Sequence, residues 1–207
     1  MTGGAYVSLS PEALGERLAE RLATCPATVR VAIDGAPCAA PDGLAEALVG
    51  PLRQRGRPVA HVRAASFWHD ASLRFEHGKQ DADSYHDWLD AGALRREVLD
   101  PAGTSRSYLP SLRDPETNRV TRAEPQGAPE GTVLLVSGPL LLGLGLPFDI
   151  TVHLAVSPAA LARRTPAHEA WTLPAFDRYQ AEVRPAEQAD IVVRLDDPKH
   201  PAVDGLR

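Results

Sequence analysis

Short apolar runs alternate with amphipathic stretches along most of this chain. The apolar runs have the length and composition of buried strands. Leucines that recur every four residues predict helices between them, and Ser10-Pro11-Glu12 is typical of a helix start. Strands that alternate with helices predict an α/β fold with a mostly parallel sheet. We expect strands at residues 28–34, 58–62, 132–136, 150–156 and 190–194, and helices at 10–22, 42–56, 91–99, 158–164 and 175–189, the last broken at Pro185.

Three segments between these elements show no clear period. Residues 67–90 are polar and rich in His and Asp, and residues 107–124 hold two short extended pieces around a turn at 114–118. Residues 165–174 are expected to form a loop that acts as a small lid. The helix at 91–99 is expected to stop at the Asp100-Pro101-Ala102-Gly103 sequence that follows it. With no repeat or linker visible, we predict a single domain over 1–207, with the N-terminal helix inside 1–27.

Composition narrows the class of protein. The 207 residues are 43% hydrophobic and 24% charged, which is enough to build a core. A net charge of −5 gives no basic face for nucleic acid. No apolar run has membrane-spanning length, and the start of the chain lacks the basic and apolar regions of a signal peptide. We therefore expect a cytoplasmic protein with no nucleic-acid or membrane partner, and a homodimer remains open.

The strand at 28–34 ends in Asp-Gly and is followed by a loop of small residues and a helix, which is the setting of a phosphate-binding loop. This stretch resembles the opening of uridine-kinase-like P-loop proteins. Residues 87–101 are similar to that family's substrate-side helix, 133–142 to its later core strand and turn, and 178–193 to its C-terminal helix and last strand. The likeness runs over residues 28–195. It implies a P-loop kinase-like parallel sheet with helices on both faces and a small lid.

The phosphate-binding loop itself departs from the family pattern G-x-x-x-x-G-K-[ST]. Gly35 is present and Cys38 lies within the loop, but Ala40, Pro41 and Asp42 stand where the second glycine, the lysine and the hydroxyl residue belong. Proline supplies neither the amine that reaches the phosphates nor a backbone N–H. We expect the Asp42 carboxylate to cap the free amides of the following helix and to repel a triphosphate.

The family's acidic positions are also changed. Ala65 stands where the resemblance places the base that receives the substrate proton, and Ser137 where it places an acid before Gly-Pro. The chain has only two lysines, Lys79 and Lys199, and neither is near the loop in sequence. Because phosphoryl transfer depends on positioning and charge neutralisation, the resemblance implies that ATP-dependent transfer is lost. No cofactor is expected.

Residues 67–90 resemble the family's substrate region, the acceptor side of the cleft, which holds the molecule that receives the phosphoryl group. Their side chains suit a polar, ring-shaped ligand. A His paired with an Asp can act as general acid and base, which makes His69, Asp70, His86 and Asp90 the candidate catalytic residues. The alternative is a polar surface segment with ordinary exposed side chains. The candidate substrate-binding residues are Phe67, Trp68, Arg74, Tyr85 and Trp88, joined by Arg163, Arg164 and Arg178 of the lid region.

The remaining reactive residues have ordinary alternatives. His69, His77 and His86 are spaced eight and nine apart and form no metal-binding pattern, so no metal site is expected. His61 and His153 lie inside apolar strands and are expected to be core or strand-edge residues. The Cys38 thiol is either activated by the helix that follows or an inert loop residue. The three lid arginines either bind an anion or pair with Glu169, Glu182 and Glu187.

Three functions follow. The leading hypothesis is a degenerate, uridine-kinase-like protein that keeps a nucleoside- or sugar-like pocket for acid–base chemistry without ATP. The first alternative is a non-catalytic binding or regulatory protein that uses the same pocket. The second alternative is a nucleoside kinase with an atypical loop.

Overall fold

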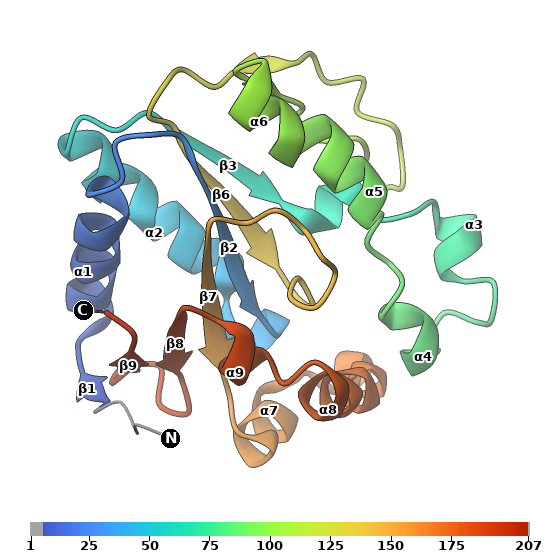
Figure 1. Cartoon of the computed structure of the whole chain (residues 1–207). Helices are drawn as coiled ribbons and strands as arrows, with labels where there is room; N and C mark the ends of the chain where they lie inside the picture. Colours follow the sequence, from blue (N-terminus) through green and yellow to red (C-terminus); the bar gives the residue numbers. More distant parts are fainter. Residues whose placement is uncertain (1–5, 207) are drawn as a thin grey trace.

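A seven-stranded sheet runs through the middle of the structure, a computed structural model that describes residues 6–206 (Figure 1). Residues 1–5 and 207 of the expected domain lie outside this range. Five strands are parallel in the order β3-β6-β2-β7-β8, and the short strands β9 and β1 extend one edge in antiparallel fashion. This confirms the predicted α/β class. The sheet consists of β1 (Val7–Ser8), β2 (Val29–Gly35), β3 (Val59–Arg63), β6 (Val133–Gly138), β7 (Ile150–Ala155), β8 (Ile191–Arg194) and β9 (Ala202–Asp204), while β4 (Ser107–Tyr108) pairs with β5 (Gln126–Gly127).

Two hydrophobic cores lie on opposite faces of the sheet. Successive side chains of a strand point to opposite faces, so Val31 and Ile33 of β2 belong to one core and Ala32 between them to the other. The central strands β2 and β6 are buried along nearly their whole length because helices cover both faces of the sheet (Figure 1).

The helices divide between these cores. Helices α1 (Pro11–Ala23) and α2 (Pro41–Gln54) cover one face, and α5 (Ala91–Leu94), α6 (Asp100–Thr104) and α8 (Leu173–Glu182) cover the other (Figure 1). The predicted start of α1 is confirmed, since the Ser10 side chain accepts the N–H of Ala13 at 3.2 Å. The shorter helices are α3 (Ala71–Arg74), α4 (Ala82–Tyr85), α7 (Pro158–Arg164) and α9 (Pro185–Gln188), a π-helical turn at Arg95–Leu99, and 3-10 turns at Pro37–Ala39, Ala64–Phe67 and Ala167–Thr172.

The helix that begins at Ala91 does not stop at Asp100 as expected. It passes through the π-helical turn into α6 and ends at Thr104. Pro101 has no N–H to donate to the carbonyl of Glu97, four residues earlier. That carbonyl accepts the N–H of Leu109 instead, at 2.9 Å, so the chain after the helix replaces the missing bond.

The C-terminal third differs from the prediction in two places. The expected loop at 165–174 contains a 3-10 turn and the first residues of α8. The break in the last helix lies at residues 183–184, just before Pro185, where Arg184 has a φ of 52°. Strands β1 and β9 were not predicted. None of the helices that the structure describes combines the length and apolarity that a membrane span needs.

Candidate functional site

The loop between β2 and α2 lies where the resemblance places a phosphate-binding loop. Two of its amides are already used, because the N–H of Ala39 donates to the carbonyl of Ala36 at 2.8 Å and that of Ala40 to Pro37 at 2.9 Å. Ala40 has a left-handed backbone with a φ of 54°, and Pro41 opens α2 without an N–H. Two of the loop amides are therefore engaged, and Pro37 and Pro41 supply none, which leaves fewer N–H groups for an anion.

Two other loop residues have roles within the protein. A Cβ at Gly35 would lie 2.8 Å from the Cβ of Leu154, so packing against β7 alone requires a glycine there. Burial raises the pKa of the Cys38 thiol, which opposes activation as a nucleophile. The carbonyl of Cys38 accepts a hydrogen bond from the guanidinium of Arg164.

Asp42 lies in the first turn of α2, but its side chain turns toward the neighbouring strands. Its Oδ1 accepts a hydrogen bond from Ser137 Oγ at the end of β6, and its Oδ2 lies 3.6 Å from Nε of Arg63 on β3. No side chain caps α2, so the expectation that Asp42 caps the helix amides is wrong. A hydroxyl and a guanidinium within reach are strong partners for a carboxylate, and they direct Asp42 away from the amides.

The Asp42–Ser137 pair is part of a small network between α2, β3 and β6. Ser137 is fully buried, and Nε2 of His61 lies 2.8 Å from its Oγ. Burial lowers the pKa of His61. Arg63 pairs with Glu46 of α2 at 2.7 Å. The pattern that the resemblance implies has the hydroxyl on the helix and the acid on the strand. Here Asp42 lies on the helix and Ser137 on the strand, and the two side chains are hydrogen-bonded.

An open cavity of about 470 Å³ lies on the acceptor side, around α3 and α4. Four of the candidate residues line it, namely His69, Arg74, Trp88 and Arg178. The other lining residues are Leu73, Glu76, His77, Asp81, Asp83, Ser84 and Asp87. Carboxylates outnumber guanidinium groups in this lining, so the cavity favours ligands rich in hydroxyl or amino groups over anions.

Arg74 forms the inner wall of this cavity. Its guanidinium lies 4.8 Å from the ring centroid of Trp88, 4.9 Å from Phe75 and 5.3 Å from Trp68, and its Nε donates to the carbonyl of His69 at 2.9 Å. The residue is 5% exposed, and burial lowers its pKa. Arg74 thus fixes the aromatic wall as much as it faces a ligand.

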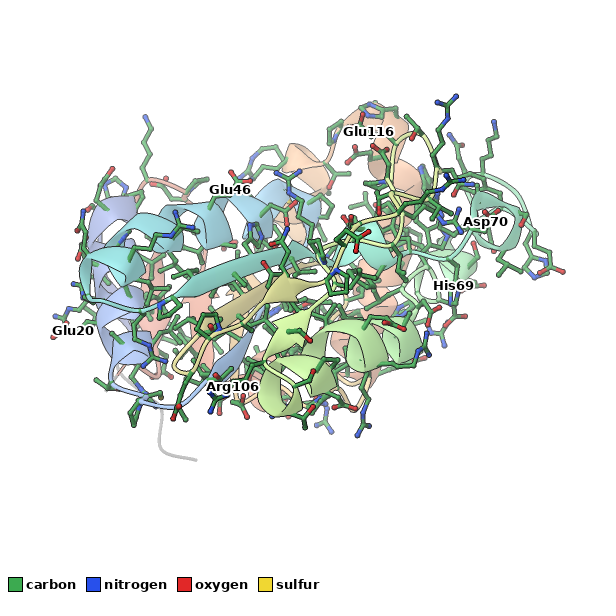
Figure 2. The ribbon with its side chains drawn as sticks, turned by 90° about the horizontal axis from the view of Figure 1, so that it is seen from above. Glu20, Glu46, His69, Asp70, Arg106 and Glu116 are labelled. Carbon is green, nitrogen blue, oxygen red and sulfur yellow. The ribbon has the colours of Figure 1, made fainter. Side chains whose placement is uncertain are left out.

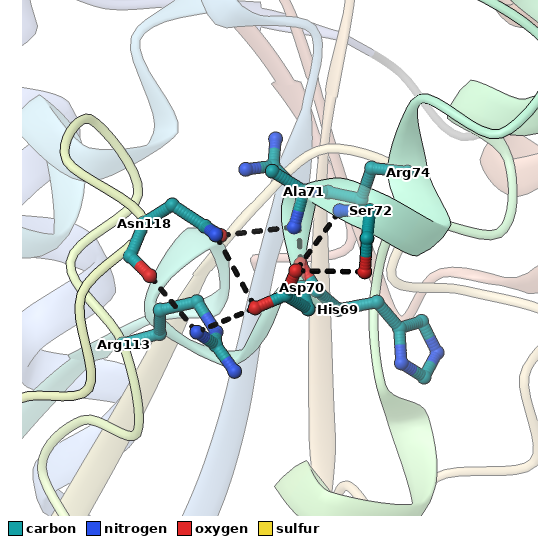
Figure 3. A network of polar contacts seen from close by, with 7 residues as sticks. All are labelled: His69, Asp70, Ala71, Ser72, Arg74, Arg113 and Asn118. Atoms are coloured by element: carbon teal, nitrogen blue, oxygen red, sulfur yellow. Dashed lines mark hydrogen bonds and ion pairs between the residues drawn. The ribbon is translucent and has the colours of Figure 1, made fainter.

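Asp70 joins two separate segments instead of lining the cavity. Its Oδ1 accepts hydrogen bonds from the backbone and side chain of Ser72, both at 2.9 Å, and thereby caps α3 (Figure 3). Its Oδ2 pairs with Arg113 at 2.9 Å and accepts from Asn118 at 3.2 Å. The bonds from Ser72 lower the pKa of Asp70. The geometry gives Asp70 a positioning role for α3 and the turn at 114–118.

Of the other three candidate catalytic residues, His69 lies near Asp90, and His86 contacts neither of them. Nε2 of His86 lies 2.9 Å from the carbonyl of Ala175, and Asp90 accepts the N–H of Ala93 at 2.7 Å as the cap of α5. His69 is partly exposed at one end of the molecule, beside Asp70 (Figure 2). Its Nδ1 lies 3.8 Å from the Asp90 carboxylate, which is the shortest His–Asp approach among the four.

The remaining candidate residues are aromatic or lie on the lid helices. Phe67 is fully buried, and Tyr85 is buried beside Trp88 with a ring-centroid distance of 4.9 Å. Trp68 packs edge-on against Trp88 at 5.2 Å. Of the lid arginines, Arg163 is exposed, Arg164 contacts backbone carbonyls, and Arg178 pairs with Glu182 at 3.1 Å. Across residues 6–206, no group of three or more His, Cys, Asp or Glu side chains is arranged to hold a metal ion.

Sequence reasoning missed part of the cavity lining and one buried polar cluster. Glu76, Asp81 and Asp83 were not singled out, although the acidic stretch at 81–87 was a visible signal. The cluster of Asp34, His153 and Tyr179 gave no signal of its own, because its members come from two strands and a helix far apart in sequence.

Comparisons with known proteins agree on the fold. No family model matches the chain, and no curated protein matches it. A structure described as a possible uridine kinase from Bacillus stearothermophilus is similar with a TM-score of 0.69 and 19% identity, over 86% of this chain and 98% of that one. A candidate fructose transport system kinase from Silicibacter sp. has a TM-score of 0.60 and 23% identity, over 87% and 95%. The YGR205w protein has a TM-score of 0.58 and 9% identity, over 95% and 99%. The chain therefore has a P-loop kinase-like fold.

Proposed function

We propose that this protein uses a P-loop kinase-like fold to bind a small polar molecule, nucleoside- or sugar-like, and does not transfer a phosphoryl group from ATP. The observation that carries the proposal is the Asp42–Ser137 hydrogen bond beside Pro41. Pro41, which has neither an amine nor an N–H, stands where the resemblance places the lysine, and Asp42 adds a negative charge where it places the hydroxyl residue.

The acceptor-side cavity supports retained binding. Its volume of about 470 Å³ lies in the range of small-molecule sites, and its lining includes several carboxylates and the guanidinium of Arg74 over the buried Trp88. Hydroxyl groups donate to carboxylates, which suits a sugar or the ribose of a nucleoside. Because Asp70 and Asp90 cap helices and His86 contacts a backbone carbonyl, the geometry favours binding over acid–base chemistry.

One observation favours the catalytic alternative. Nδ1 of His69 lies 3.8 Å from the Asp90 carboxylate, and His69 lines the cavity. A carboxylate on one ring nitrogen leaves the other free to exchange a proton with a ligand. This alternative predicts turnover of a ligand without ATP, and that turnover should fall by about 10²–10⁴-fold in His69→Ala.

The test has two arms. In the first, calorimetry with ATP·Mg²⁺ at millimolar concentration should show no binding, and a micromolar dissociation constant that depends on Mg²⁺ would contradict the proposal. In the second, nucleosides and sugars are screened by thermal shift without ATP, since a ligand at 100 times its Kd stabilises the protein by about 2.7 kcal/mol.

A variant pair makes the second arm specific. Asp87→Asn changes the cavity lining, whereas His168→Ala changes an exposed residue outside it. A ligand of the acceptor side should lose affinity in the first variant and keep it in the second. Equal affinity in both variants, or no hit among these compound classes, would refute the assignment. Mass spectrometry of the incubated ligand separates binding from turnover.

A further inference from the structure

A second polar cluster lies at the end of β2, and the proposed function does not use it. Asp34 is fully buried, and its Oδ1 accepts the N–H of Leu141 at 2.9 Å. Its Oδ2 lies 2.7 Å from Nδ1 of His153 and 3.1 Å from the hydroxyl of Tyr179. The same hydroxyl accepts the N–H of Leu142 at 2.9 Å. The cluster thus joins β2, β7, α8 and the turn after β6.

The direction of these bonds fixes the proton on the imidazole. The Tyr179 hydroxyl receives a backbone N–H, so its own proton points to Asp34. Burial and the Asp34 carboxylate raise the pKa of Tyr179, which keeps the phenol protonated. A carboxylate only accepts hydrogen bonds, so with Asp34 ionised the hydrogen of the third bond is on Nδ1 of His153. In the neutral ring, Nε2 is then an acceptor.

This acceptor has no partner. His153 is 3% exposed, and its Nε2 is buried without a hydrogen bond to any residue in the described range 6–206. Leaving a buried acceptor unpaired is unfavourable in free energy, so a hydrogen-bond donor at this position would be stabilising.

His153 lines a cavity of about 30 Å³ between the ends of β2 and β7 and helices α7 and α8. Figure 1 shows both helices next to the end of β7. Most of the walls are apolar, with Leu140, Leu154, Val156, Pro158, Leu161 and Phe176 among them. Two exposed polar residues on α8, Asp177 and Gln180, complete the lining. The cavity is larger than one water molecule needs. The carboxylate of Asp177 at its edge favours a ligand with a positive charge.

We propose that this cavity binds the end of a ligand that carries an amino or hydroxyl group on a short alkyl chain. The terminal group donates a hydrogen bond to Nε2 of His153, the alkyl part contacts the apolar walls, and Asp177 attracts an ammonium. The site is separate from the acceptor-side cavity and shares none of its lining residues.

The test is a titration of the unmodified protein, observed by ¹⁵N NMR of its histidine rings. Three probes of equal length are used at constant pH, namely n-propylamine, n-propanol and propionate. Because the affinity of ligands this small is limited, the titration extends to concentrations on the order of 0.1 M. The His153 signals are assigned by comparison with His153→Gln or, if that variant does not fold, by elimination with single substitutions of the other histidines.

We expect His153 to carry its proton on Nδ1, and the amine and the alcohol to shift its Nε2 signal in a saturable way. Propionate should leave that signal unchanged, and exposed His200 should respond to none of the probes. No saturable shift with either donor would show that the cavity takes water only and would overturn the proposal. A shift with propionate alone would show that Nε2 of His153 carries a hydrogen and donates it, and this result would also overturn the proposal.

A filled-cavity variant locates the binding. Ala36 lines the cavity, so Ala36→Val should abolish the saturable shift, while the matched change Ala162→Val on the exposed side of α7 should keep it. Unchanged binding in Ala36→Val would place the probe elsewhere and refute the site. His69→Ala should not affect this titration, so failure at one cavity has no bearing on the other.

Discussion

Exchanging Asp42 and Ser137 should restore the stability that either single change removes. Ser137 is fully buried and bonded to both Asp42 and His61. Asp42→Ser removes a hydrogen bond to a charged group, which is worth about 1.5–3 kcal/mol when buried and less here, because the Asp42 side chain is 42% exposed. We expect a loss of about 1 kcal/mol.

The single change Ser137→Asp should destabilise the protein more than Asp42→Ser does. Two carboxylates about 4 Å apart repel each other by about 1 kcal/mol in water and about 4 kcal/mol at the effective dielectric of a protein surface. The partial exposure of Asp42 places the expected loss near 2 kcal/mol, which is about 4–8 °C in Tm for a chain of this size. In the double variant a hydroxyl again faces a carboxylate, so its stability should approach that of the unmodified protein.

Urea denaturation of the four proteins, followed by circular dichroism, measures the interaction energy of the pair. We expect an interaction of about 3 kcal/mol in favour of the double variant, which is the sum of the two single losses. Single effects that add within about 0.5 kcal/mol would show that the two side chains do not interact, and the account of the loop as a rearranged Asp–Ser pair would fail.

Three further predictions concern the loop and the acceptor side. Combining Ala40→Gly, Pro41→Lys and Asp42→Ser should give measurable affinity for inorganic phosphate by calorimetry. It should not give kinase turnover, because Ala65 and Ser137 still lack carboxylates. Turnover would show that these two positions are misassigned. Asp70→Asn should reduce the decrease in Tm on acidification. Hydrogen bonds lower the pKa of Asp70 in the folded state, so the stabilisation by its carboxylate is fully present above the unfolded-state pKa near 3.9. That stabilisation is lost as the pH decreases through the folded-state pKa. An unchanged Tm profile between about pH 2 and 6 would contradict this role. Arg74→Lys should destabilise the protein by about 1–2 kcal/mol and shift tryptophan fluorescence to the red, since an ammonium cannot stack on three rings as a guanidinium does; an unchanged spectrum would argue against the stacked wall.

The parallel part of the fold was predictable because burial on both faces produces nearly continuous apolar runs, as at residues 133–136 of β6. Strands β1 and β9 escaped prediction because they have only two and three residues, too few for a period to show. The helix beyond Pro101 escaped for a different reason: the bond from Leu109 to the Glu97 carbonyl is a tertiary contact, and local sequence rules contain no information about it.

For the candidate site, the sequence indicated which segment lines the cavity but not what the individual side chains in that segment do. Residues 67–90 do contribute most of the acceptor-side cavity, but Asp70 and Asp90 are helix caps, which a local pattern of Asp before a short helix also produces. The partner of Asp42 depends on the pairing of β2 with β6, which brings Ser137 next to a residue 95 positions earlier. Spacing along the chain does not specify such a contact.

The contacts of Arg164 bear on motion in the molecule. Its guanidinium joins the end of α7 to the carbonyls of Cys38 in the loop and Leu195 after β8. A helix tied at one point can rotate as a hinge, whereas one tied to two separate segments moves only when both bonds break or both segments follow. The loop, α7 and the end of β8 should therefore open as one cooperative unit in hydrogen exchange, with similar protection in all three.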